Sequence, residues 1–140
     1  MATAIDELRF GRDLNLPESA DDALALTVTG DVQSVAGREN LRKAVRCRAV
    51  TVQGELVHRP EYGGDLPLYV ERASTPAGRA ALANALRRGA FRDDRLKDVA
   101  VEVSTGTPAD STAEDAVTIA MTITARTEDV AEQITFGVQS

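Results

Sequence analysis

The strongest constraint on the fold is a stretch near the C-terminus, residues 117–125, in which apolar residues alternate strictly with threonine or alanine. A period of two places successive side chains on opposite faces of an extended chain, so this stretch predicts a β-strand with one buried face. Residues 99–103 and 132–138 show the same alternation. Gly106 to Asp115, rich in Thr, Pro, Asp and Ser, is typical of the hairpin loop between the first two strands. The C-terminal third therefore predicts an antiparallel sheet. The apolar positions of its longest strand are Val117, Ile119, Met121, Ile123 and Ala125.

Two segments have apolar residues at helical spacing instead. Residues 35–50 predict a helix with Ser34 as its N-cap. Thr75 and Pro76 predict the N-cap and first position of a second helix, and Gly89 fits its C-terminal end. We therefore expect an α+β fold, in which one antiparallel sheet has two main helices packed on one face.

The N-terminal part is patterned more weakly. We expect residues 1–12 to form a flexible arm and residues 13–140 to form a single domain. Residues 13–17 are compatible with an edge strand stopped by Pro17, and residues 24–29 with another short strand.

Composition excludes several classes of protein. The chain has 140 residues and a formal net charge of -6, with no basic face of the kind that nucleic acid requires. No run of about 18 apolar residues is present, so we expect no membrane insertion. The first residues lack the pattern of a secretory signal, and the single cysteine, Cys47, cannot form an internal disulfide, which fits synthesis in a reducing cytoplasm.

Few side chains offer catalytic or metal-binding chemistry. His58 is the only histidine and is expected to be solvated or structural, and Cys47 is expected to be a buried core thiol. The acid pairs Asp21-Asp22 and Asp93-Asp94 fit solvated loops, because adjacent acids do not imply the separation of about 5–9 Å used in glycoside hydrolysis. We therefore expect no catalytic, cofactor-binding or metal site. A group of arginines is either a solvated helix face or a surface that pairs with acids of a partner: Arg38, Arg42, Arg46 and Arg48.

The segment from Thr51 to Gly63 reads T-V-Q-G-E-L-V-H-R-P-E-Y-G and has the character of a structural signature. The first helix is expected to end at Thr51, and Gly54-Glu55 predicts a turn. Residues 56–62 are expected to be extended, since Pro60 disfavours helical backbone in Arg59. For the same reason Pro67 predicts that Leu66 is extended.

The pattern T-x-x-G-E-L-x-x-R-P-E-[YF]-G resembles the small baseplate-wedge, or sheath-initiator, family of contractile phage tails, some members of which have been described as lysozyme-like. The family also includes the matching subunit of type VI secretion and of other contractile injection systems. Residues 10–16 resemble its N-terminal F/Y-G-x-D-[LI]-x-L segment, and Gly37, Leu41, Ala44 and Val45 match its helix pattern. Arg95 matches the arginine of its Glu-Pro-Arg loop, whereas Asp93 and Asp94 differ from the Glu and Pro.

The resemblance implies structural work in a baseplate. The implied partners are larger baseplate wedge proteins, the sheath subunit and central hub or tube proteins, with six copies per baseplate, in a phage virion tail or an injection-system particle. An edge strand fits that role, because its unpaired main-chain groups are a template for a partner's strand. The residues expected to contact partners are Arg59, Glu61, Tyr62, Arg95, Ile134 and Phe136. Those expected to maintain the motif's structure are Thr51, Gly54, Glu55, Pro60 and Gly63.

One alternative belongs to a different class. Glu55 and Glu61 are the acids that a small glycan hydrolase could use. The sequence leaves open which kind of contractile machine contains the chain.

Overall fold

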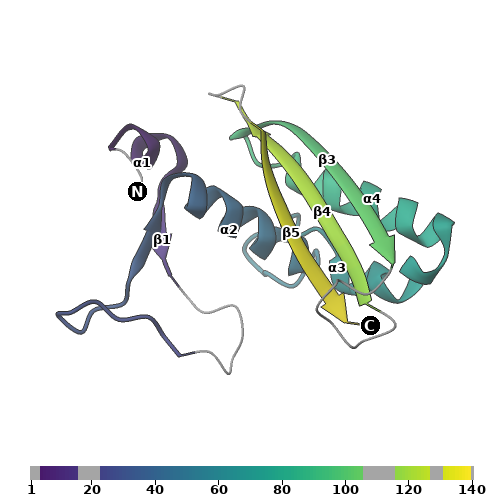
Figure 1. Cartoon of the computed structure of the whole chain (residues 1–140), viewed down its shortest axis with the longest axis horizontal. Helices are drawn as coiled ribbons and strands as arrows, with labels where there is room; N and C mark the ends of the chain where they lie inside the picture. The colour runs from purple at the N-terminus through teal and green to yellow at the C-terminus, as the bar shows by residue number, and fades with distance from the viewer. Residues whose placement is uncertain (1–3, 16–22, 106–115, 127–130, 140) are drawn as a thin grey trace. The chain divides into compact units, whose positions relative to one another are not determined.

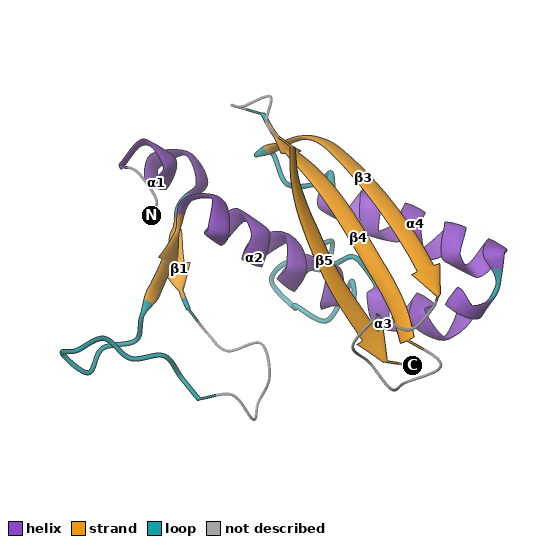
Figure 2. Cartoon of the chain, in the orientation of Figure 1, coloured by secondary structure: helices purple, strands orange, loops and turns teal. Residues whose placement is uncertain are grey.

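The computed structural model describes residues 4–15, 23–105, 116–126 and 131–139 (Figure 1). The chain divides into two compact units, residues 1–44 and 45–140. Helices and antiparallel strands occur in both, so the predicted α+β class is confirmed (Figure 2). The predicted loop at 106–115 and the acid pair Asp21-Asp22 lie outside the described residues. The extent of the 13–140 domain stays a prediction.

The first unit contains a helix that the sequence patterning did not predict, α1 (Ala4–Phe10). The Phe10 side chain is buried, and its carbonyl accepts a hydrogen bond of 2.9 Å from Nδ2 of Asn40, itself a buried side chain. Burial of one aromatic ring and a partner for the last helical carbonyl give α1 its tertiary contacts. Whether residues 1–12 move as an arm stays a prediction.

The strands of this unit differ from the single expected sheet. β1 (Arg12–Leu14) pairs antiparallel with β2 (Ser34–Ala36) in a separate two-stranded sheet. The strand expected over residues 24–29 is reduced to one isolated bridge, between Leu26 and Val32. The chain reverses immediately after it, where Thr27 accepts from the Gly30 amide at 3.0 Å and donates its own amide to the Asp31 carbonyl at 2.7 Å.

α2 (Gly37–Val50) runs across the boundary between the two units. It begins two residues later than predicted, and Ser34, the expected N-cap, belongs to β2. Gly37 adopts a φ of 67°, which allows the chain to turn from strand into helix within one residue. Leu41 and Val45 are buried, as the helical spacing of apolar residues predicted, and the buried stripe continues to Ala49, four residues further on.

The three predicted C-terminal strands are confirmed in the second unit. β3 (Leu96–Thr105), β4 (Ala116–Ala125) and β5 (Ala131–Gln139) form an antiparallel sheet in that order. The alternation in β4 has the predicted effect: its five apolar positions from Val117 to Ala125 are buried, and the residues between them are partly exposed.

α4 (Pro76–Ala90) is the second predicted helix and packs against β3, behind the sheet in Figure 1. Oγ1 of Thr75 accepts a hydrogen bond of 3.0 Å from the Gly78 amide, so the predicted N-cap is confirmed. Leu82, Leu86 and Ala90 bury the helix face. Gly89 lies inside the helix and does not end it. Since α2 crosses between units, its packing on the sheet stays a prediction.

A short helix, α3 (Leu66–Tyr69), and a 3-10 helix, η1 (Val70–Ser74), follow the motif segment. The prediction that Leu66 is extended is wrong. Asp65 adopts a φ of 58° and turns the chain, so that Leu66 begins a helix and Pro67 lies in its first turn, where a missing amide hydrogen costs nothing.

Gly78 gives a test of this packing. A Cβ atom at Gly78 would lie 1.6 Å from the Arg72 carbonyl oxygen, so Gly78→Ala forces backbone of η1 and α4 apart. We expect the free energy of unfolding to fall by about 3 kcal/mol, although helix propensity alone would raise it by about 1 kcal/mol.

Chemical denaturation of Gly78→Ala beside Ala80→Gly measures the difference. Ala80 is exposed on the same helix, and its replacement should cost about 1 kcal/mol. A Gly78→Ala protein as stable as the wild type would contradict the predicted clash.

Candidate functional site

The motif segment is held at the end of α2 by main-chain hydrogen bonds. The carbonyl oxygen of Thr51 accepts from the amides of Gly64 at 3.1 Å and Asp65 at 3.2 Å. The Thr51 hydroxyl donates to the Cys47 carbonyl at 2.8 Å, and the Gln53 amide donates to Oδ1 of Asp65 at 2.7 Å. Thr51 thus closes the helix end and anchors the returning chain.

Between these anchors the segment is a series of turns, so the prediction of an extended segment over residues 56–62 is wrong. The Gly54 amide donates to the Pro60 carbonyl at 2.8 Å, and the Val52 amide donates to Oε2 of Glu55 at 3.1 Å. Gly54 has a φ of 87°, a conformation that side chains disfavour. The Tyr62 amide donates to the Arg59 carbonyl at 2.9 Å, so Pro60 is the second residue of a turn, a position that its fixed φ suits. Gly54, Glu55 and Pro60 therefore all take part in the folded loop.

Tyr62 lies half-buried beneath an arginine of α2. The guanidinium carbon of Arg48 is 4.3 Å from the centre of the Tyr62 ring, a cation–π geometry. Burial raises the pKa of the Tyr62 hydroxyl, and the positive charge of Arg48 opposes this rise. Arg48 is therefore not simply part of a solvated helix face.

Asp93 and Arg95 form an ion pair in the turn after α4. Nε of Arg95 donates to Oδ1 of Asp93 at 2.8 Å, and its NH2 donates to Oδ2 at 2.6 Å. The Arg95 amide donates to Oδ1 as well, at 3.1 Å. Asp93 is buried, with a side chain 7% exposed, against 30% for Arg95. Burial alone would raise the pKa of Asp93, but the hydrogen bonds from Arg95 outweigh burial and lower it.

The predictions for Asp93 and Cys47 are wrong. Asp93 is a buried, paired group, so the expectation of a solvated acid pair is wrong for this residue. Cys47 is exposed, so the prediction of a buried core thiol is also wrong: the buried stripe of α2 follows Val45 and Ala49 and does not include it. His58 is exposed. Arg38, Arg42 and Arg46 also take part in polar or ring contacts within the chain.

Arg59 and Glu61, two expected partner contacts, are exposed on the loop. The Glu61 carbonyl accepts a hydrogen bond from the guanidinium of Arg92, which joins this loop to the turn after α4. The motif loop, Tyr62 and the Asp93–Arg95 pair thus form one polar surface region of the second unit, hereafter the loop cluster. Its role in partner binding stays a prediction.

The edges of the sheet are the second candidate region. The amide of Val99 donates to Oδ1 of Asp98 at 2.9 Å, and its carbonyl accepts from Nε of Arg87 at 3.1 Å. Val99 lies opposite Ile123 in the β3–β4 register. Because both main-chain groups of Val99 bond to side chains, the two residues are a non-hydrogen-bonded pair, and Val99 faces the outer edge of β3.

In an antiparallel pair, hydrogen-bonded and non-hydrogen-bonded residue pairs alternate, so the outward orientation of the Val99 main-chain groups determines the orientation of those in β4 and β5. Ile123 directs its main-chain groups to β5, opposite Glu132, and the same holds for Met121 opposite Ile134. Ile134 and Phe136 therefore use their main-chain groups in the β4 ladder, and the Ile134 side chain is buried. The residues between them direct their main-chain groups to the outer edge of β5: Gln133, Thr135 and Gly137.

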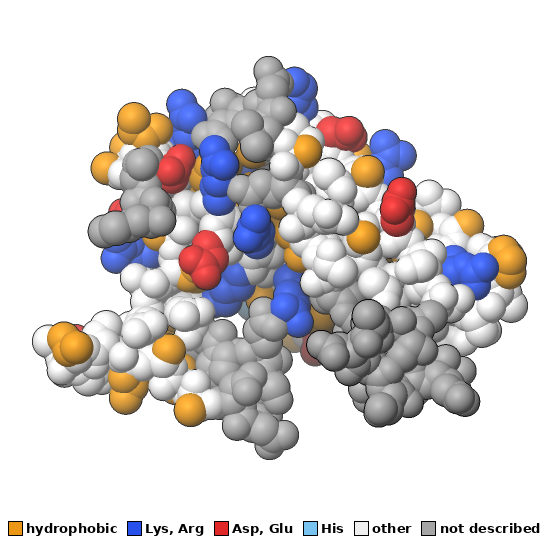
Figure 3. Space-filling view, viewed as in Figure 1, with side chains coloured by type: hydrophobic (Ala, Val, Ile, Leu, Met, Phe, Trp, Pro, Cys, Tyr) orange, Lys and Arg blue, Asp and Glu red, His pale blue; other side chains and the backbone are white. Residues whose placement is uncertain are grey.

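The sequence suggests Thr135 as an outward position of this strand, but Gln133 and Gly137 were missed, because alternation of side chains does not reveal which peptide groups are already bonded. In the space-filling view the face of the sheet toward the viewer is mostly neutral, with scattered apolar side chains (Figure 3).

Within the described residues no cluster of three potential metal ligands occurs, and no helix is both long and apolar enough to cross a bilayer.

Comparison with solved structures identifies proteins of the same fold. A candidate tail lysozyme from Geobacter sulfurreducens is 17% identical, with a TM-score of 0.59 over 83% of this chain and 95% of that one. A chain in the six-fold symmetrised baseplate of the anti-feeding prophage is 22% identical, with a TM-score of 0.52 over 73% of this chain and 78% of that one. No family model and no curated protein sequence matches the chain.

The Asp93–Arg95 pair predicts a dependence of stability on pH. The pKa of Asp93 is lower in the folded state than in the unfolded state, so its contribution is complete above the ordinary carboxyl pKa of about 4. It is lost as pH falls through the lowered, folded-state pKa. Asp93→Asn removes this titration and should cost about 2 kcal/mol at pH 7.

Unfolding free energies measured between pH 2 and pH 7 check this prediction. The difference between wild type and Asp93→Asn should be constant at neutral pH and shrink below about pH 4. Asp94→Asn, at the exposed neighbour, should follow the wild-type curve. Parallel curves for wild type and Asp93→Asn over the whole range would contradict the pairing.

Proposed function

We propose that this chain is a structural subunit of the baseplate of a contractile tail or injection system. It binds larger wedge proteins and starts the sheath by receiving a strand beside β5. It is synthesised in the cytoplasm and incorporated into the particle. The observation that carries the proposal is the outer edge of β5, where Gln133, Thr135 and Gly137 direct main-chain groups away from β4. The motif resemblance and the fold shared with a baseplate chain support the same class.

The energetics of strand addition fit a particle with repeated subunits. Each main-chain hydrogen bond contributes about 1 kcal/mol net, so one added strand attaches weakly on its own. Several copies arranged in a ring would engage a ring of sheath subunits together, and such multivalency raises the overall affinity without new contacts. The six-fold symmetrised baseplate of the anti-feeding prophage is consistent with an arrangement of this kind.

The loop cluster is the part that we assign to the wedge proteins. Arg59 and Glu61 are exposed on a loop whose backbone is fixed at both ends, so they can present charge to a partner with little loss of backbone conformational entropy. The partly exposed guanidinium of Arg95 lies in the same region, held by Asp93. A partner that approaches this surface would meet a prearranged set of charges.

A proline at Thr135 tests the sheath interface. Because the Thr135 amide faces the outer edge, Thr135→Pro leaves the β4 ladder intact and removes a donor that an incoming strand needs. We expect a folded subunit that enters baseplates but starts no sheath, seen in electron micrographs as baseplates and tubes without sheath.

Thr135→Ala is the matched control, since it changes the side chain and keeps the amide; its sheaths should be normal. Thermal melting of both variants should lie near that of the wild type. Sheaths of normal length on Thr135→Pro baseplates would exclude this edge as the starting point.

The hydrolase alternative gives a separate prediction. The Glu55 carboxylate accepts the Val52 amide, and Glu61 is exposed on the loop surface. Neither lines the cavity of about 360 Å³ that the described residues of α4 and β3 form. We therefore expect no release of dye from labelled peptidoglycan by the wild type, above the level of Glu55→Gln and Glu61→Gln. Release that either substitution abolishes would favour the enzyme.

A further inference from the structure

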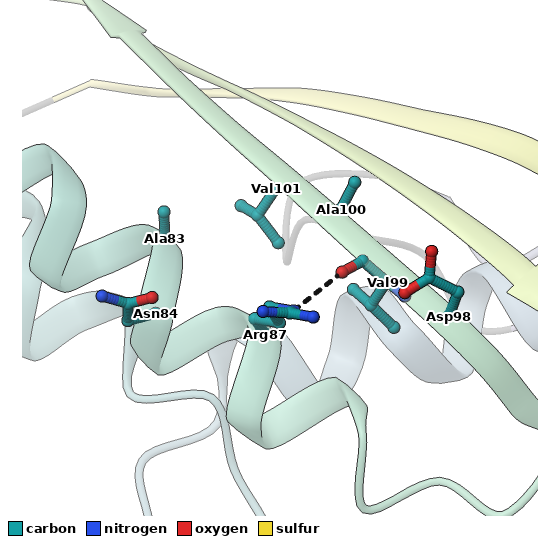
Figure 4. A pocket seen from close by; sticks show the side chains of 7 residues that line it. All are labelled: Ala83, Asn84, Arg87, Asp98, Val99, Ala100 and Val101. Carbon is teal, nitrogen blue, oxygen red and sulfur yellow. Dashed lines mark hydrogen bonds between the residues drawn. The ribbon is translucent and has the colours of Figure 1, made fainter.

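The outer edge of β3 differs chemically from the outer edge of β5. At Val99 both main-chain groups that face the edge are bonded to charged side chains, the amide to Asp98 and the carbonyl to Arg87. Figure 4 shows the Arg87 side chain reaching from α4 to the Val99 carbonyl. At Gln133 and Thr135 of β5 the structure describes no bond of this kind to the main-chain groups.

Arg87 is held in place by its own helix. Its guanidinium carbon is 5.4 Å from the centre of the Phe91 ring, one helical turn further along. The cavity beside it is lined by Ala83, Asn84 and Arg87 of α4 and by residues 98–101 of β3. A strand added along β3 would have to pass through this space and displace the guanidinium from Val99.

The register of β3 adds a second obstacle at the same place. Leu96 lies opposite Ala125, and Asp98 lies opposite Thr124, so Lys97 is an extra residue in the strand. Such a bulge bends the strand and increases its twist, which disfavours pairing along its outer edge. Beyond Val99 the residues that face the edge are Val101, Val103 and Thr105, enough for only a short pairing.

We propose that Arg87 and Asp98 are specificity-determining residues that close the β3 edge, so that a partner strand can be added only beside β5. The assignment of β5 rests on the proposed function; the closure of β3 rests on the contacts at Val99. A subunit with one open edge can extend its sheet in one direction only. Two open edges would allow copies of the chain to pair with each other through β3.

The test opens the β3 edge in the isolated full-length chain. Arg87→Ala combined with Asp98→Ala removes both caps. The matched control, Arg88→Ala with Glu102→Ala, makes the same change in charge on the same helix and strand, at exposed side chains for which the structure describes no hydrogen bond or ion pair. Sedimentation velocity over a concentration series should show self-association at least ten-fold stronger in the double variant than in the control and the wild type.

A proline at Val101 shows which edge is responsible. The Val101 amide faces the outer edge, so Val101→Pro keeps the ladder with β4 and blocks pairing along β3. Added to Arg87→Ala/Asp98→Ala, it should return sedimentation to the wild-type pattern. The proposal would be overturned if the double variant and the control associated equally. It would also be overturned if the addition of Val101→Pro left the self-association of the double variant unchanged.

Amide exchange gives a readout that does not require the double variant to remain folded. In the wild type the Val99 amide should exchange more slowly than the amides of Val101 and Val103, which share the edge but have no cap. Asp98→Ala should speed exchange at Val99 about ten-fold and leave Ile123 protected, and Asp98→Asn should restore slow exchange. Equal exchange at all three valines in the wild type would overturn the capped edge.

These measurements use the chain alone, so they are distinct from the test of the proposed function. Normal sheaths on Thr135→Pro baseplates would exclude the role at β5 and leave the capped β3 edge standing. Loss of sheath on Thr135→Pro baseplates, with no effect of Arg87→Ala/Asp98→Ala on self-association, would support the role at β5 and overturn the closure of β3.

Discussion

Three backbone segments of the second unit meet without side chains between them, and this contact determines where the loop cluster lies. A Cβ atom at Gly64 would lie 2.9 Å from Cα of Ala49 in α2, and one at Gly89 would lie 2.7 Å from the Gly63 carbonyl of the motif loop. The loop is therefore clamped between the end of α2 and the end of α4. A methyl group at Gly64 or Gly89 would separate the elements, because close-packed backbone has no free volume to absorb it.

The clamp explains why distant parts of the sequence act together. Tyr62 follows the turns of the motif and lies under Arg48, while the Asp93–Arg95 pair follows α4 at the far side of the same contact. The hydrogen bond from Arg92 to the Glu61 carbonyl joins the two sides. Asp93, two residues before Arg95, supplies the carboxylate that holds the Arg95 guanidinium in this position.

The sequence predicts an element well when neighbouring residues determine its conformation, and poorly when contacts with distant residues do. β4 and α4 were predicted because a strict period of two and a threonine–proline start leave few alternatives. The turn at Gly54-Glu55 was predicted, but the turns over residues 56–62 were not, because they depend on hydrogen bonds such as that from the Gly54 amide to the Pro60 carbonyl, which no local pattern reveals. α1 depends on burial of Phe10 and on a distant amide, that of Asn40, which no local pattern reveals.

The candidate site shows the same division. The resemblance names Tyr62 and Arg95 as expected partner contacts, and alternation predicts the strand at 132–138, but side-chain alternation cannot tell which peptide groups of a strand point away from its neighbour. That information comes from Asp98 and Arg87, whose hydrogen bonds to the main chain of Val99 show that Val99 is not bonded to β4. From this, the alternation of the ladder shows which residues of β4 and β5 are bonded to each other. The same two bonds that show which peptide groups of β5 face away from β4 also occupy the edge of β3. A three-stranded sheet needs both properties if it is to be extended in one direction, because a second open edge would allow copies of the chain to add to one another through β3.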